Sequence, residues 1–199
     1  MQQPIYNKIA KENVNGEIIE YGIVYGNEKI VFIKAGYLGN IQGYEDKYLK
    51  IAHRLHNRLG ATVICASNPD ADYDAQVAAD KVMIEQVAAE AGFSEYQVYL
   101  LGTSDGGYQN LLMAQAVPQT VKFLGINPSQ ISFYDLTKRL QSLAHVKKHL
   151  VYGTKDELYQ YVPSLQALDC ANLEILTVEG ADHEFTGRVE EFIALTDLI

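Results

Sequence analysis

Residues 97–107 read QVYLLGTSDGG, and this stretch decides the fold more than any other part of the chain. Its first five residues are mostly apolar and β-favouring, which predicts a short strand. Residues 105–117 are predicted to form a helix that ends before Pro118. Between them, Gly102-x-Ser104-x-Gly106 has the spacing of a sharp turn that holds a serine hydroxyl above the end of a sheet. Side chains two residues before and after the serine would collide across such a turn, so glycine is favoured there. The segment therefore predicts strand, turn and helix, with Ser104 as a candidate nucleophile.

Strands and helices alternate on both sides of this segment. Near the start, residues 5–11 and 17–25 flank Asn15-Gly16, a dipeptide that suits a tight hairpin turn because both residues accept positive φ. The further predicted strands are residues 29–34, 61–66, 97–101, 121–126, 149–152 and 173–178. The predicted helices are residues 44–59, 74–91, 105–117, 134–143, 159–168 and 184–198.

Several predicted strands are apolar throughout and do not alternate. That pattern is typical of parallel strands that helices cover on both faces. We therefore expect an α/β fold, with a doubly wound, mostly parallel sheet of about eight strands and helices on both faces. The chain of 199 residues contains no repeat, low-complexity tract or Pro/Gly-rich linker, so residues 1–199 are interpreted as a single domain.

A candidate acid and a candidate base follow two later strands. Asp156 and Glu157 lie in the loop after residues 149–152, and His183 lies in the loop after residues 173–178. Because the carboxyl ends of parallel strands share one edge of the sheet, these loops should lie beside Ser104. A serine hydroxyl needs an adjacent base, and the histidine needs a carboxylate to fix its tautomer. Asp156 is the preferred acid and Glu157 the alternative, whereas Asp182 is too close in sequence to His183 for such a contact.

Composition limits the possible partners. The formal net charge of −9 argues against nucleic acid, which needs a basic surface. No apolar run reaches the roughly 20 residues that span a membrane, and residues 1–16 do not resemble a signal peptide. Cys65 and Cys170 form no CxxC motif or metal pair. We therefore expect a cytoplasmic protein that needs no metal or organic cofactor and has no membrane or nucleic-acid partner.

Together, the hairpin, the Gly-x-Ser-x-Gly turn, the Asp loop and the His loop resemble the α/β-hydrolase superfamily over nearly the whole chain. In the predicted turn, the Asp105 N–H at the start of the helix is the natural first donor to an oxyanion. The resemblance implies a second donor in the loop 35–40, where the Tyr37 N–H fits. Gly36 and Tyr108 are expected to border the pocket, as is Tyr37.

The chain departs from the superfamily pattern in three places. Ala35-Gly36 stands where many relatives carry His-Gly. Asp105 stands where small or apolar residues are frequent, and its carboxylate would be able to disfavour anionic substrates. Only 22 residues separate Ile126 from His149, where many relatives insert a helical lid, so we expect no cap domain.

The expected chemistry is acyl transfer to water from a small ester or thioester, through an acyl-enzyme on Ser104. Three alternatives share the same residues. The machinery also suits an acyltransferase or a peptidase, and a domain of this fold can bind a ligand or partner without catalysis.

Overall fold

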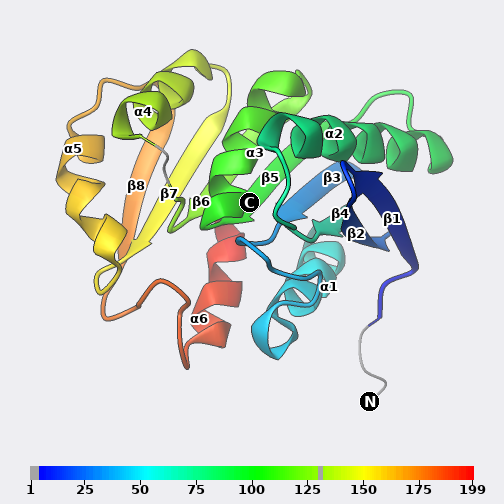
Figure 1. Ribbon diagram of the computed structural model, residues 1–199, viewed down its shortest axis with the longest axis horizontal. Helices are drawn as coiled ribbons and strands as arrows, with labels where there is room; N and C mark the ends of the chain where they lie inside the picture. Colours follow the sequence, from blue (N-terminus) through cyan, green and yellow to red (C-terminus); the bar gives the residue numbers. More distant parts are fainter. Residues whose placement is uncertain (1–4, 130–131) are drawn as a thin grey trace.

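The computed structural model describes residues 5–129 and 132–199 and contains an eight-stranded sheet (Figure 1). The strand order is β1-β2-β4-β3-β5-β6-β7-β8. β2 pairs antiparallel with β1 and with β4, and all other neighbours are parallel. The predicted mostly parallel sheet of about eight strands is therefore confirmed. The strands are β1 (Lys8–Val14), β2 (Glu17–Val24), β3 (Asn27–Lys34), β4 (Ala61–Ala66), β5 (Gln97–Thr103), β6 (Thr120–Ile126), β7 (Lys147–Gly153) and β8 (Leu173–Val178).

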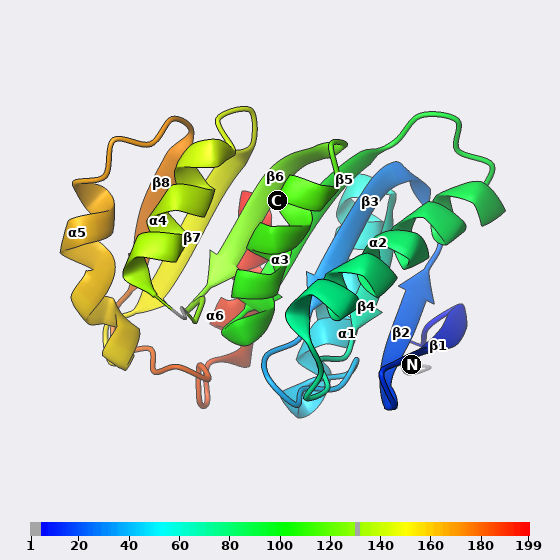
Figure 2. The same cartoon turned by 45° about the horizontal axis from the view of Figure 1, so that its top comes forward.

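Helices cover both faces of the sheet, as predicted (Figure 2). On one face lie α2 (Tyr73–Glu90), α3 (Asp105–Ala116), α4 (Phe133–Ser142) and α5 (Val162–Gln166). On the other lie α1 (Lys47–Leu59) and α6 (Val189–Ala194). Three short 3-10 segments complete the described part: η1 (Tyr44–Asp46), η2 (Glu157–Tyr161) and η3 (Leu195–Leu198). The sheet thus separates two apolar layers.

The continuous apolar strands lie at the centre of the sheet, where both faces are covered. All six residues of β4, ATVICA, are buried, including the free thiol of Cys65. Burying both faces of a strand removes apolar surface from water at about 25 cal/mol per Å². That gain explains why the sequence of this strand does not alternate.

The N-terminal hairpin forms at the predicted turn but with a later first strand. Asn15 and Gly16 have φ of 55° and 98°, the left-handed values that a two-residue hairpin turn needs. Because the turn is so short, the ladder begins at once with Val14 opposite Glu17. The predicted strand 5–11 was therefore wrong in its limits, and β1 covers Lys8–Val14.

Two predicted helices begin later than expected because residues with left-handed backbone precede each of them. The final helix was predicted from residue 184, but Phe185 and Gly187 have φ of 57° and 70°, and α6 begins at Val189. The helix predicted from residue 44 is interrupted at Glu45 and Asp46, whose φ values are 51° and 57°. Left-handed residues cannot continue a right-handed helix. Both breaks matter, because they precede residues that line the site described below.

The connection from β6 to β7 contains α4 and its flanking loops, with no inserted domain among the described residues. Residues 130–131 of this connection lie outside the described part, as do residues 1–4 at the start of the chain. Within residues 5–129 and 132–199, no helix has the length and apolar character needed to cross a membrane.

Candidate active site

Ser104 occupies a strained turn between β5 and α3, with φ of 50° and ψ of −124°. Flanking glycines make this turn possible. A Cβ on Gly102 would lie 2.2 Å from the Gly106 carbonyl oxygen, and a Cβ on Gly106 would lie 2.2 Å from the carbonyl oxygen of Ala35. The collision at Gly102 is across the turn, as predicted, whereas the collision at Gly106 is with the end of β3. The turn is therefore fixed against the neighbouring strand as well as by its own geometry.

A continuous hydrogen-bond chain joins Ser104, His183 and Asp156. His183 Nε2 lies 2.8 Å from Ser104 Oγ, and His183 Nδ1 lies 2.7 Å from Asp156 Oδ2. The Asp156 side chain is fully buried, while about a third of the His183 side chain is exposed. Three loops at the carboxyl ends of β5, β7 and β8 bring these residues together.

The carboxylate defines which nitrogen of His183 carries the proton. An ionised carboxylate only accepts hydrogen bonds, so Nδ1–H donates to Asp156 and the Nε2 lone pair faces the Ser104 hydroxyl. The bond to Asp156 raises the pKa of His183 above its ordinary value, and it outweighs burial, which acts in the opposite direction. Glu184 and Glu157 add smaller contributions that also raise it. The arrangement is one in which a histidine can remove a serine proton.

The two other candidate acids are placed elsewhere. Glu157 is exposed at the start of η2, and the second oxygen of Asp156, not Glu157, accepts from the Leu158 N–H. The Asp182 carboxylate accepts from the Thr186 N–H at 2.8 Å, which holds its pKa below the ordinary value. The geometry therefore brings Asp156, the preferred acid, to His183.

Asn127 connects the acid loop to the histidine loop, and the sequence alone did not reveal it. Its Nδ2 donates to the carbonyl oxygens of Asp182 and His183 at 3.3 and 2.9 Å, and its Oδ1 accepts from the Gly153 N–H at 2.9 Å. The residue is buried, with φ of 43°. An asparagine directly after a buried strand was the available signal, since asparagine tolerates left-handed backbone better than most residues.

Near Ser104, the backbone N–H groups of Asp105 and Tyr37 have no acceptor among the described residues. Asp105 is the first residue of α3, so its N–H belongs to the positive end of that helix. A Cβ on Gly36 would lie 3.5 Å from Ser104 Cβ, which places the loop after β3 directly beside the serine. Both predicted donors therefore lie in segments next to the hydroxyl.

The Asp105 side chain is buried beneath the turn. Its carboxylate accepts from Asn68 Nδ2 and Gln109 Nε2, both at 2.9 Å, and from the Tyr73 hydroxyl. Asn68 Nδ2 also donates to the Ala35 carbonyl oxygen at 3.1 Å, so this network ties the turn to the loop after β3. Asp105 does not line the cavity at Ser104, so its carboxylate is not placed to disfavour anionic substrates there.

The cavity at Ser104 has a volume of about 360 Å³. Of the predicted pocket residues, Gly36 and Tyr37 line it. Tyr108 does not: it is buried against Tyr73, and its hydroxyl donates to Asp135. Lys47 and Phe192 also line the cavity and were not predicted to do so.

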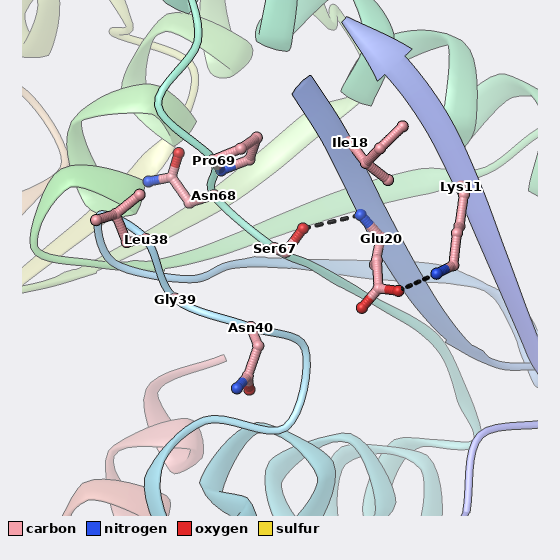
Figure 3. Close-up of a pocket in the computed structure, with 9 residues that line it drawn as sticks. All are labelled: Lys11, Ile18, Glu20, Leu38, Gly39, Asn40, Ser67, Asn68 and Pro69. Atoms are coloured by element: carbon pink, nitrogen blue, oxygen red, sulfur yellow. Dashed lines mark hydrogen bonds and ion pairs between the residues drawn. The ribbon is translucent and has the colours of Figure 1, made fainter. Parts of the chain in front are cut away.

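A second cavity, of about 370 Å³, lies on the other side of the loop after β3 (Figure 3). Gly39 borders both cavities. In Figure 3, Lys11 pairs with Glu20, and the Ser67 hydroxyl accepts from the Glu20 N–H. The Lys11, Glu20 and Ser67 groups already have partners, and the Ser104–His183 pair opens onto the other cavity, which is therefore the candidate site.

Comparison with protein-family models gives no match, and comparison with curated proteins by sequence gives none either. Solved structures do match. An alpha-beta serine hydrolase homologue from Coxiella burnetii has a TM-score of 0.73 and 18% identity, over 98% of this chain and 99% of that chain. Est1E from Butyrivibrio proteoclasticus has a TM-score of 0.71 and 14% identity, over 94% of this chain and 95% of that chain. Alpha/beta hydrolase domain-containing protein 10 from mouse has a TM-score of 0.63 and 16% identity, over 96% of this chain and 97% of that chain. At these identities the likeness shows the fold.

Proposed function

We propose that this chain, which has the α/β-hydrolase fold, is a serine hydrolase that cleaves a small carboxylic ester or thioester. The observation that carries the proposal is the hydrogen-bond chain from Ser104 through His183 to the buried Asp156. A strained serine with a correctly oriented histidine is costly to hold, and such strain is concentrated at functional sites. A domain that only binds a ligand has no need of this arrangement.

The proposed reaction begins with the Ser104 hydroxyl, which attacks the carbonyl carbon while its proton moves to His183 Nε2. Asp156 stabilises the imidazolium that forms. The Asp105 and Tyr37 N–H groups donate to the developing oxyanion, and each such donor contributes on the order of 10²–10³ in rate. His183 then protonates the leaving alcohol or thiol. Water, activated by the same histidine, releases the acid and restores Ser104.

The cavity favours a small substrate. Its volume of about 360 Å³ lies near the lower end of the roughly 300–1,000 Å³ typical of small-ligand sites. Structural neighbours of similar fold include Est1E, which has been solved with ferulic acid bound, and a 2,6-dihydroxy-pseudo-oxynicotine hydrolase. These neighbours support hydrolytic chemistry on this fold. The proposal of a small substrate for this chain is based on the volume of its own cavity.

A panel of nitrophenyl esters of increasing acyl length tests the proposal. We expect hydrolysis of the short esters and a loss of about 10⁴-fold or more in kcat for Ser104→Ala, because the nucleophile is removed. Asp156→Asn should lose about 10⁴-fold, because the histidine tautomer is no longer fixed. Glu157→Gln is the matched control and should stay within a few-fold of wild type.

Two results would contradict this account. Ester hydrolysis that persists in Ser104→Ala would exclude Ser104 as the nucleophile. Loss of activity in Glu157→Gln, with Asp156→Asn unaffected, would move the role of the acid to Glu157.

A further inference from the structure

Lys47 places a buried positive charge in the wall of the Ser104 cavity. It is the first residue of α1 and is only 6% exposed, yet it lines the same cavity as Ser104 and His183. Its ammonium lies 4.5 Å from the ring centroid of Phe192 and 5.3 Å from that of Tyr48. Within the described part of the chain, no carboxylate lies close enough to the Lys47 ammonium to form an ion pair.

This placement opposes folding stability in two ways. Burial lowers the pKa of Lys47, which means that the charged form is disfavoured where it sits. The residue also stands at the N-terminus of a 13-residue helix, where the helix dipole is positive and a cation is unfavourable. The two aromatic faces compensate only in part. An anion in the cavity would supply the missing partner and would also suit the helix end.

The chain holds Lys47 firmly in this position. Gly43 precedes it with φ of 71°, and a Cβ there would lie 2.9 Å from Lys47 Cγ. Glu45 and Asp46 adopt left-handed φ immediately before it. The lysine stem is therefore packed between this turn and the aromatic rings.

We propose that Lys47 binds a carboxylate carried by the substrate, so that the preferred substrate is an ester or thioester of a short dicarboxylic acid with one free acid group. This inference rests on the proposed function for the reacting bond and adds the group recognised beside it. Lys47 would fix the orientation of the substrate through a charge-assisted hydrogen bond. The ester carbonyl would then face Ser104.

Glu184 also lines this cavity, and its negative charge attracts the Lys47 ammonium. This attraction does not replace an ion pair. Glu184 is exposed, and its charge raises the pKa of Lys47 without forming an ion pair. Water screens an exposed charge more strongly than a buried one. Glu184→Gln should therefore increase the preference for a charged ester, because it removes a competing attraction for the ammonium.

The kinetic test compares two nitrophenyl esters of similar length, the glutarate monoester and the neutral valerate. The measured quantity is the ratio of their kcat/KM values. We expect Lys47→Met to lower this ratio by about ten- to a hundredfold, mainly through KM, since a hydrogen bond to a charged group is lost. Lys47→Arg should restore part of the preference. Lys50→Met, which removes an exposed lysine of the same helix, should leave the ratio unchanged.

A binding test separates this inference from the proposed function. Ser104→Ala, titrated with monomethyl glutarate and dimethyl glutarate by calorimetry, requires no turnover. We expect the monoester to bind at least tenfold more tightly, and the difference to disappear when Lys47→Met is added. If the monoester binds in this way but the wild-type protein hydrolyses no ester, the anion site is supported and the esterase proposal is overturned.

Equal binding of the two esters, or no binding of the monoester, would overturn the role of Lys47. A charged-to-neutral ratio that Lys47→Met leaves unchanged would also overturn it, even if Ser104-dependent hydrolysis is observed. Thermal unfolding of each variant shows whether a lost signal reflects a lost fold.

Discussion

At the scale of single residues, His183 is the group whose titration should control the proposed reaction. Its imidazole must be neutral to accept the Ser104 proton, and the bond to Asp156 raises its pKa above the ordinary value of about 6.5. Activity should therefore rise with pH, with a midpoint above about 6.5. The profile of kcat/KM for a neutral ester measures this.

Asp156→Asn provides the control for that profile. It removes the largest contribution that raises the pKa of His183, so the midpoint should move to lower pH as the maximum rate falls. A wild-type midpoint at or below the ordinary histidine value would contradict the assigned pair.

The three residues of the hydrogen-bond chain were easier to predict from the sequence than the residues around them. Ser104, Asp156 and His183 each follow a parallel strand, β5, β7 or β8, so the sheet brings the three residues to one edge. Lys47 carries no such signal, and Asn127 carries only a weak one, an asparagine directly after a buried strand. Their positions depend on left-handed turns at Glu45, Asp46 and Asn127 itself, and no regular pattern predicts such turns.

At the scale of elements, the Ser104 turn depends on close packing between β5, α3 and the end of β3. Gly106→Ala would place a methyl group 2.2 Å from the Ala35 carbonyl oxygen, a backbone atom that cannot move without shifting β3. We expect a loss of about 2 kcal/mol or more in the free energy of unfolding. Denaturant titration measures this loss.

Gly36→Ala is the matched control for that substitution. Its new methyl group would make only an ordinary contact, 3.5 Å from Ser104 Cβ. The stability of Gly36→Ala should stay within about 1 kcal/mol of wild type. A Gly106→Ala variant as stable as Gly36→Ala would show that the turn is not fixed by β3.

The limits of two strands were predicted at both ends, and those of other elements were predicted less well. Residues 61–66 and 173–178 match β4 and β8 at both ends. The last helix was predicted five residues too early, because Phe185 looks like a helical core position. Its backbone instead turns at φ of 57° to hold the histidine loop.

At the scale of the whole molecule, the described residues leave the cavity without a cap domain. Among residues 127–129 and 132–146, only α4 and its loops connect β6 to β7. Hydrolysis of a soluble ester should therefore saturate smoothly, with no rise when the ester passes its solubility limit. Initial rates measured across that limit, with and without detergent micelles, test this expectation. A sharp increase at the interface would indicate that a covering segment must move.

The overall architecture was predictable because one rule governs it. Non-alternating apolar strands require helices on both faces, and the strand–helix alternation then places the strand ends together. The cavity lining was predicted only in part. The loop residues at the strand ends were expected there, whereas Lys47 of α1 and Phe192 of α6 were not, because the strand pattern does not indicate how these helices pack beside the site.

The central claim is that His183 activates Ser104 as a nucleophile, and covalent labelling tests it most directly. Wild-type protein is treated with a fluorophosphonate, and intact mass and peptide mapping follow the adduct. We predict one adduct, on Ser104, absent from Ser104→Ala and formed far more slowly in His183→Ala. Well-folded wild type that remains unlabelled, or His183→Ala that reacts at the wild-type rate, would contradict the account.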